Sequence, residues 1–258
     1  MLTENEFIET YLKPLCRSKG SLSLSDDAAI LTPSPNQDII ISKDMLIADQ
    51  HFFADDRPDD IAYKALAVNL SDIAAKGATP KSVMLGLAFP IAPEPSWAKA
   101  FCKGLEDTME QYGIHLLGGD TTGTKGPLVL SVTIFGEVES GKMVKRSGAQ
   151  AGDHIYVSGT LGDAALGYQL RKKLIDGNKL GLSDEENNKL IKRYLRPTPR
   201  CELASLLKDT ATSAMDLSDG LIADLEKLSN VSNIGAKINL DEVPVSKAAM
   251  KLFSSDPN

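Results

Sequence analysis

The chain has 258 residues, of which 42% are hydrophobic and 24% are charged. This is an ordinary globular composition, and it excludes a disordered chain; the length allows one large domain or two of common size. With 28 Lys and Arg against 35 Asp and Glu, the formal net charge is −7, which argues against nucleic-acid binding because that function needs a basic surface. An anionic substrate is still allowed, because a bound divalent metal can reverse the local charge.

Cysteine usage and the N-terminus indicate the compartment. Cys16, Cys102 and Cys201 are far apart and lack metal-ligand spacing, so neither a disulfide framework nor a zinc site is expected. The N-terminus has acidic residues where a signal peptide has basic ones, and no apolar run approaches roughly 18 residues. The sequence therefore predicts a cytoplasmic protein that has no membrane or nucleic-acid partner.

In the first half, helical and strand patterns alternate. Apolar spacing predicts helices over 5–16, 61–76 and 97–112. Compact apolar runs predict strands over 38–42, 82–89, 114–117 and 128–138. At least one hairpin is expected among these strands.

A polar, glycine-bearing stretch over 140–152 predicts a boundary between domains 1–145 and 146–258. Beyond it, the same reasoning predicts helices over 163–175, 184–195, 200–208 and 219–228. Strands are predicted over 154–158, around 214–215 and over 236–240. The fold class that follows is α+β in two domains.

Aspartates recur at the ends of the predicted elements. Carboxylates are the hard oxygen ligands that magnesium prefers, and magnesium neutralises the phosphates of a nucleotide. Taken singly, each aspartate is better explained as a turn or helix-cap residue, and only their convergence would favour a metal site. The residues concerned are Asp26, Asp27, Asp44, Asp72, Asp120, Asp216 and Asp219.

Asp72 is the least ordinary of these aspartates. On a helix it shares one stripe with Ile61, Ala65 and Val68, so its carboxylate follows a mostly apolar face. A carboxylate there needs a partner. Metal ligation and a rim position with a salt bridge to Lys76 both satisfy that need.

Residues 117–125, LGGDTTGTK, form a predicted Gly/Thr-rich loop directly after a strand. Backbone N–H groups freed by glycines can hold phosphate, although such a loop is also an ordinary turn. Gly118 and Gly123 have P-loop spacing, but Thr124 stands where that motif needs lysine, so Walker-type chemistry is not predicted. Arg146 could clamp a phosphate or could be a surface residue.

Taken in order, these segments resemble the thiamine-monophosphate kinase family, in the superfamily of aminoimidazole ribonucleotide synthetase and selenophosphate synthetase. The resemblance covers nearly the whole chain. Its specificity lies in the ordered combination of AYKALAVNLSD (62–72), GGDTT (118–122) and DLSDGL (216–221), and KRSGA (145–149) is a further matching segment.

The resemblance implies ATP- and magnesium-dependent transfer of a phosphoryl group onto thiamine monophosphate, giving thiamine diphosphate. Several magnesium ions would be held by Asp27, Ser42, Asp44, Asp72, Asp120, Asp216 and Asp219. ATP would be contacted by Gly119, Asp120, Arg146 and Ser218, and His51 would lie at the thiamine-phosphate side. The acceptor phosphate is already ionised near neutral pH, so no covalent or general-base residue is assigned and direct in-line attack is expected.

The resemblance also implies a homodimer. The N-terminal domain would bind ATP and metal, and its mixed sheet with helices would form a barrel in the dimer. The C-terminal domain would be an α/β sandwich that lacks its last elements, because the chain ends before the family's Gly-Gly-Glu-Asp-Tyr-Glu segment.

Two positions depart from the family pattern: Ser25 stands where the family has glycine, and Lys43 where it has threonine. Two alternatives to the kinase remain open, the first of them because the chain ends before the Gly-Gly-Glu-Asp-Tyr-Glu segment. One is a non-catalytic nucleotide-binding or dimerisation fragment, and the other is a different ATP-dependent synthetase of the superfamily.

Overall fold

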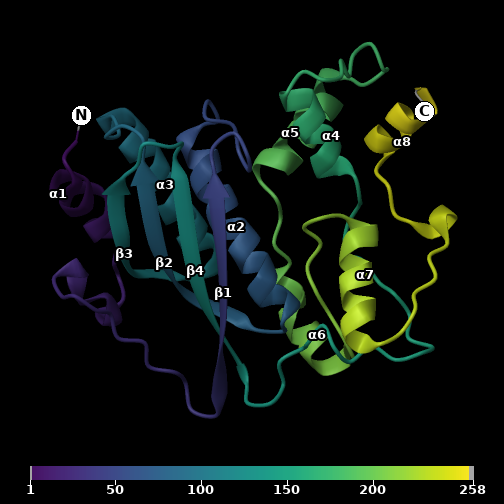
Figure 1. Cartoon of the computed structure of the whole chain (residues 1–258), viewed down its shortest axis with the longest axis horizontal. Coiled ribbons are helices and arrows are strands. Elements are labelled where there is room, and N and C mark those ends of the chain that lie inside the picture. The colour runs from purple at the N-terminus through teal and green to yellow at the C-terminus, as the bar shows by residue number, and fades with distance from the viewer. Residues whose placement is uncertain (1, 256–258) are drawn as a thin grey trace. The chain divides into compact units, whose positions relative to one another are not determined.

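The computed structural model describes residues 2–255, which divide into two compact units (Figure 1). The first unit contains residues 2–144 and Pro199–Thr210. The second contains Lys145–Thr198 and residues 211–255. The chain therefore leaves the first unit, returns to it for one short segment, and leaves it again.

The first unit is built on a mixed sheet with the strand order β1-β4-β2-β3. β4 pairs antiparallel with both β1 and β2, whereas β2 and β3 run parallel, so β1 and β3 are the two edges. The expected α+β class with a mixed sheet is confirmed. The strands are β1 (Gln37–Ile47), β2 (Thr79–Phe89), β3 (His115–Gly123) and β4 (Val129–Glu139).

The expected hairpin is wrong for the part of the chain that the structure describes. Each antiparallel pair joins strands that are not consecutive in the sequence, and the consecutive strands β2 and β3 are parallel. A parallel pair needs a crossover connection, which α3 (Pro95–Tyr112) supplies here.

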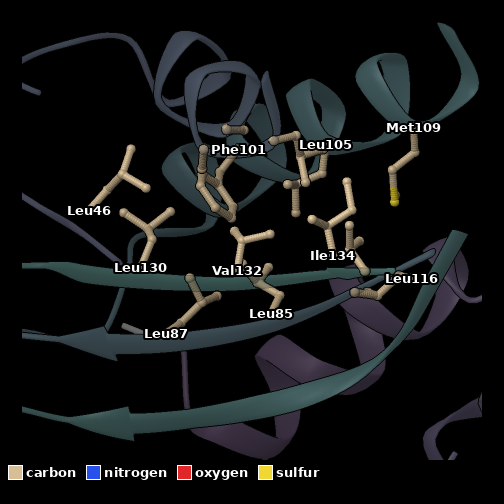
Figure 2. Close-up of a cluster of buried hydrophobic side chains, with 14 of the residues drawn as sticks. Leu46, Leu85, Leu87, Phe101, Leu105, Met109, Leu116, Leu130, Val132 and Ile134 are labelled. Carbon is tan, nitrogen blue, oxygen red and sulfur yellow. The ribbon is translucent and has the colours of Figure 1, made fainter. Parts of the chain in front are cut away.

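One face of the sheet carries the core. Strand residues alternate between the two faces, and apolar side chains occupy the positions that point toward the helices. Figure 2 shows Leu85, Val132 and Ile134 beneath Phe101 and Leu105 of α3, all of them buried. On the opposite face, apolar side chains remain exposed, including Ile41, Met45 and Met84.

The helices on the core face have clear local signals. α2 (Pro58–Ala75) begins with proline at its first position and with two aspartates in its first turn, which suits the positive end of a helix. α3 also begins with proline, and it ends at Gly113, whose φ of 64° is left-handed. Both long helices confirm the sequence prediction within a few residues.

Short elements complete the first unit. Phe7 packs edge-on against Phe89, with ring centroids 5.6 Å apart, so the N-terminal turns lie beside the end of β2. The segment that returns to this unit packs against α2. These elements are α1 (Glu4–Phe7), η1 (Ile8–Leu12), η2 (Lys13–Leu15), η3 (Lys19–Leu24), η4 (Cys201–Leu203) and α6 (Ala204–Thr210).

The second unit has its own small core, formed by Leu182, Leu190, Ala248 and Leu252. Ser183 starts α5 with a capping box, as its hydroxyl accepts from the Glu186 N–H. The helical elements are α4 (Asp163–Arg171), α5 (Asp184–Leu195), α7 (Leu221–Ser232), η5 (Leu240–Glu242) and α8 (Lys247–Ser255).

The three strands predicted for the second half are wrong within the described residues. The run at 154–158 forms no strand, with Tyr156 89% exposed, and residues 214–215 and 236–240 also form none. A single isolated bridge joins Leu161 to Val245. A strand-like run needs a neighbouring strand to satisfy its backbone, so the described part of this unit holds helices and loops instead of the expected α/β sandwich.

Over residues 2–255, none of the helices combines the length and the apolar character needed to cross a bilayer. Cys16, Cys102 and Cys201 are free thiols in this structure.

Candidate functional site

Ser42, Asp44 and Asp72 lie together on the helix-covered face of the sheet. Ser42 and Asp44 are alternate residues of β1, so both side chains point toward α2, which carries Asp72. The Ser42 hydroxyl donates a hydrogen bond to Asp72 Oδ2 at 2.5 Å. All three residues are half-buried. The structure thus brings together three residues for which the sequence predicted metal ligation.

Electrostatics at this cluster favour a cation. Burial raises the pKa of the Asp44 carboxyl above its ordinary value, and the neighbouring Asp72 raises it further, whereas His51 lowers it. Two carboxylates in a half-buried place repel each other unless positive charge lies near them.

The same cluster fits magnesium chemically. Magnesium is commonly held by one or two carboxylates together with water and substrate phosphates. Within residues 2–255 there is no group of three or more His, Cys, Asp or Glu side chains that could hold a metal by itself. Asp44, Asp72 and the Ser42 hydroxyl would therefore supply part of a coordination shell, and a nucleotide or water would supply the rest.

Lys43 points away from this cluster. Its ammonium group donates to the hydroxyls of Ser131 and Thr133 on β4, on the face of the sheet opposite Asp44. The lysine that replaces the family threonine therefore adds no side-chain ligand to the metal cluster.

Asn69 belongs to this site, and sequence reasoning missed it. The side chain is fully buried in α2; Oδ1 accepts the Asp44 backbone N–H at 3.2 Å and Nδ2 donates to the Ala65 carbonyl at 2.9 Å. Asn69 thus fixes the β1 backbone where it presents Asp44. An amide three residues before Asp72, within the otherwise apolar run ALAVNL (65–70), was the available signal.

His51 lies in the turn that follows β1 and is exposed. Its Nδ1 accepts the Ile47 backbone N–H at 3.0 Å, so a neutral imidazole carries its proton on Nε2. The Lys64 ammonium, 6% exposed, donates to the His51 carbonyl at 3.2 Å. Lys64 therefore holds the backbone of His51, the residue predicted to bind the substrate. Sequence reasoning missed Lys64 as well.

Gly119 and Asp120 lie within β3, not in a loop after a strand as expected. Parallel pairing with β2 gives their backbone regular partners, which extends the strand through the glycine-rich sequence to Gly123. A Cβ on Gly119 would lie 1.8 Å from the Leu85 carbonyl oxygen, so this close approach requires glycine. Asp120 is exposed beside Gly86.

Within the first unit, Asp120 is far from Asp44. The register runs from Asp120 through Gly86 and Ser131 to Met45, so Asp120 lies on the open face and Asp44 on the helix-covered face. Three strand spacings of about 4.8 Å also put β1 and β3 roughly 14 Å apart. One copy of the sheet does not bring these two predicted metal ligands together.

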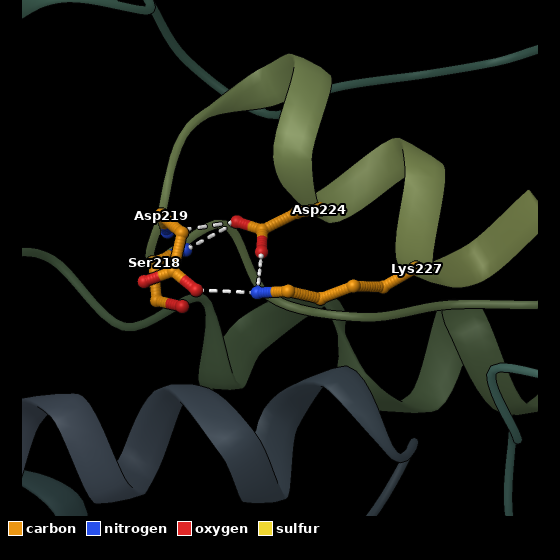
Figure 3. A network of polar contacts seen from close by, with 4 residues as sticks. All are labelled: Ser218, Asp219, Asp224 and Lys227. Atoms are coloured by element: carbon orange, nitrogen blue, oxygen red, sulfur yellow. Dashed lines mark hydrogen bonds and ion pairs between the residues drawn. The ribbon is translucent and has the colours of Figure 1, made fainter.

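In the second unit, Ser218 and Asp219 form the turn before α7 (Figure 3). Their backbone N–H groups both donate to Asp224 Oδ2, at 2.8 and 2.9 Å. The Asp219 carboxylate is paired with the Lys227 ammonium. Gly220, with a φ of 104°, follows in a conformation that suits glycine. Asp224 and Lys227 were not singled out from the sequence.

The remaining predicted residues are placed as follows. Asp27 lies in an exposed bend between η3 and β1, and Asp216 is half-buried before α7. The Arg146 carbonyl accepts hydrogen bonds from the hydroxyls of Ser213 and Ser232, at 2.7 and 2.9 Å, while the residue itself is exposed. The backbone of Arg146 is thus held while its guanidinium can reach solvent.

Known proteins are similar to this chain in sequence and in fold. Residues 25–138 match the AIR synthase related protein N-terminal domain, and residues 150–257 match its C-terminal domain. The thiamine-monophosphate kinase of Salmonella typhimurium is 45% identical over 229 residues, which cover 88% of this chain and 68% of the relative.

Two solved structures agree. The thiamine-monophosphate kinase of Stenotrophomonas maltophilia K279a has a TM-score of 0.82 at 41% identity, covering 95% of this chain and 76% of that one. AaThiL complexed with AMPPCP and TMP has a TM-score of 0.79 at 30% identity, covering 97% and 77%. The chain therefore belongs to the thiamine-monophosphate kinase family of AIR synthase related proteins.

Proposed function

We propose that this chain catalyses the ATP-dependent phosphorylation of thiamine monophosphate to thiamine diphosphate. The observation that carries the proposal is the Asp44–Asp72 carboxylate pair with the Ser42 hydroxyl, in a chain 45% identical to a thiamine-monophosphate kinase. A phosphate oxygen of the acceptor attacks the γ-phosphorus of ATP in line. The new O–P bond forms as the bond to the β-phosphate oxygen breaks, and ADP leaves.

The protein's part in this reaction is to position the reactants and balance their charge. Magnesium would neutralise phosphate charge during the transfer. In the first unit, the ligands would be Asp27, Ser42, Asp44, Asp72 and Asp120. In the second unit, they would be Asp216 and Asp219. ATP contacts are proposed for Gly119, Asp120, Arg146 and Ser218.

His51 is proposed to bind the acceptor phosphate. Nδ1 accepts the Ile47 N–H, so a neutral imidazole carries its proton on Nε2, and an N–H is the kind of donor that an anionic phosphate oxygen accepts from. Lys64 keeps this turn in place through the His51 carbonyl.

We also propose that the chain acts as a homodimer through an N-terminal domain of residues 1–145, with residues 146–258 as the second functional domain. Asp44 and Asp120 lie on opposite edge strands and opposite faces of one sheet. A second copy could place its β3 beside β1 and complete the ligand set. The exposed Ile41, Met45 and Met84 on the open face support such an interface. The three unpaired thiols support a cytoplasmic location.

The test is product formation from Mg-ATP and thiamine monophosphate by the parent chain and by Asp120→Asn. Thiamine diphosphate should form with the parent and be lost with the variant. Asp107→Asn, on an exposed position of α3, is the matched control and should keep the activity.

Melting the same samples with and without Mg-ATP separates the alternatives. Stabilisation without turnover would identify a nucleotide-binding module. If Mg-ATP produces neither stabilisation nor turnover, the proposal is refuted. A phosphorylated enzyme intermediate would refute direct transfer.

A further inference from the structure

Asp224 and Lys227 of α7 have no part in the function proposed above, but they form a charged network with Ser218 and Asp219, which do (Figure 3). Asp224 is fully buried, and its Oδ2 accepts both the Ser218 and the Asp219 backbone N–H. Its Oδ1 accepts a hydrogen bond from Lys227 Nζ at 2.9 Å. The same ammonium group pairs with the Asp219 carboxylate. One lysine thus joins a buried carboxylate to an exposed one.

The two contacts of the Lys227 ammonium group, with Asp224 and with Asp219, differ in how easily another partner can replace them. Asp224 is held on all sides, and removing its contacts would leave two backbone donors without an acceptor. The Asp219 side chain is 62% exposed, so its contact with Lys227 can be replaced from solvent. Lys227 is therefore anchored on Asp224, and its charge lies at the carboxylate that was predicted to bind metal.

We propose that Lys227 is a built-in competitor of the divalent cation at Asp219. Asp219 is a hard oxygen donor whose carboxylate is already paired with a positive charge, the Lys227 ammonium group, so it suits a metal ligand. Lys227 balances its charge while no metal is bound, and a divalent cation must displace the ammonium from Asp219. This inference rests on the proposed metal role of Asp219.

The experiment titrates the full 258-residue chain with Mn²⁺ alone and follows free Mn²⁺ by electron paramagnetic resonance. All samples carry Asp44→Asn, which removes the carboxylate pair of the first unit. Lys227→Gln should lower the apparent Kd for Mn²⁺ about threefold to tenfold, the order expected for loss of one half-exposed competing charge. Lys227→Arg keeps the charge and should restore the parent Kd.

Two controls isolate the contact. Lys189→Gln removes an exposed lysine of α5, so it changes the net charge equally and should leave the Kd unchanged. In an Asp219→Asn background, Lys227→Gln should no longer change the Kd.

The outcomes separate this inference from the function on which it rests. If Asp219→Asn alone leaves Mn²⁺ binding unchanged, the metal role of Asp219 is wrong and the competition is wrong with it. If Asp219→Asn weakens binding but Lys227→Gln does not tighten it, the metal role stands and the competition is refuted. Tightening that persists without the Asp219 carboxylate would also refute it.

Discussion

Asp44 is held in a place that costs stability when no cation is present. Desolvation and the neighbouring Asp72 both oppose its ionisation, while its backbone is fixed by the buried Asn69. Functional carboxylates are often kept in such positions at the expense of the folded state. The size of that cost can be measured, because an amide can replace the carboxylate with little change in shape.

Asp44→Asn should raise the free energy of unfolding of the metal-free protein by about 1 kcal/mol at pH 7, the size of a modest charge effect, and abolish kinase activity. The pKa of Asp44 is raised in the folded state, so ionisation of this carboxyl lowers the free energy of unfolding of the wild type as the pH rises. The difference from Asp44→Asn should therefore vanish below about pH 3.8, where the carboxyl is protonated in both the folded and the unfolded state. Asp38→Asn on the same strand is the control. The Asp38 carboxylate accepts from the Gly141 N–H and the Ser140 hydroxyl, and its pKa is lowered, so this variant should lose stability. Chemical denaturation in the presence of a chelator measures the free energy of unfolding of both variants. A change of the same sign in Asp44→Asn and Asp38→Asn would contradict this explanation.

Lys64 should give the protein a second pH dependence. Burial lowers the pKa of its ammonium group from 10.5 to about 8, although Asp56 and Asp60 oppose the shift. Between these values the unfolded chain binds more protons than the folded one, so stability should rise with pH from about 8 to 10.5. The gain relative to Lys64→Met should be on the order of 3 kcal/mol. Denaturation curves of both proteins across this range test it, and parallel pH profiles would refute the assignment.

At the scale of elements, α2 connects the core to the site. One helix supplies Asn69 and Asp72 to the carboxylate cluster and Lys64 to the His51 turn, while its apolar residues pack on the sheet. Its position depends on α3, because Gly104 lets the two helices approach closely. An added Cβ at Gly104 would lie 2.7 Å from the Asp59 backbone.

Gly104→Ala should therefore destabilise the protein by about 1–2 kcal/mol, since the overpacking exceeds the gain in helix propensity. The Asp59 atoms in the way belong to the backbone, so the helices themselves must shift. Gly235→Ala, with no heavy atom within 4 Å of the added Cβ, should be neutral or slightly stabilising. Thermal melts compare the two, and equal melting temperatures would show that the helices adjust freely.

The elements also show what sequence could and could not predict. Helix limits at Gly113 and Ser183 follow from local capping chemistry, so α3 and α5 were predicted closely. The extension of β3 through Gly118–Gly123 was missed because its backbone is satisfied by β2, a non-local partner. The false strand at 154–158 has the opposite cause, a β-favouring run without a neighbouring strand. Asn69 and Lys64 were missed because their roles depend on contacts with other segments.

At the scale of the whole molecule, the open face of the sheet bears on whether one copy of the chain can hold all the proposed ligands or a dimer is needed. The exposed Ile41, at 61%, lies on edge strand β1, and Asp120 lies on the other edge. In the proposed dimer, a subunit interface here would bury apolar surface and would also bring Asp120, a proposed ligand, from one copy to the Asp44 cluster of the other.

Ile41→Glu should weaken the dimer at least tenfold, because it buries an unpaired charge, whereas Ile91→Glu, at a 69% exposed loop position, should not. Sedimentation velocity measures the monomer–dimer equilibrium of both variants. Mixing inactive Asp44→Asn and Asp120→Asn chains should restore about a quarter of the activity, since half of the dimers then carry one intact site. A monomeric parent chain, or no restoration on mixing, would show that each subunit works alone.

The return of Pro199–Thr210 to the first unit has a consequence for biosynthesis. A growing chain folds its early domains as they leave the ribosome. Here the first unit lacks its last helix until residue 210 has been made, although its sheet is complete at Glu139. Ala204, 5% exposed, and the neighbouring turn would reach α2 only after much of the second unit had been synthesised. The surface of α2 that this segment covers would remain open to chaperones throughout that interval.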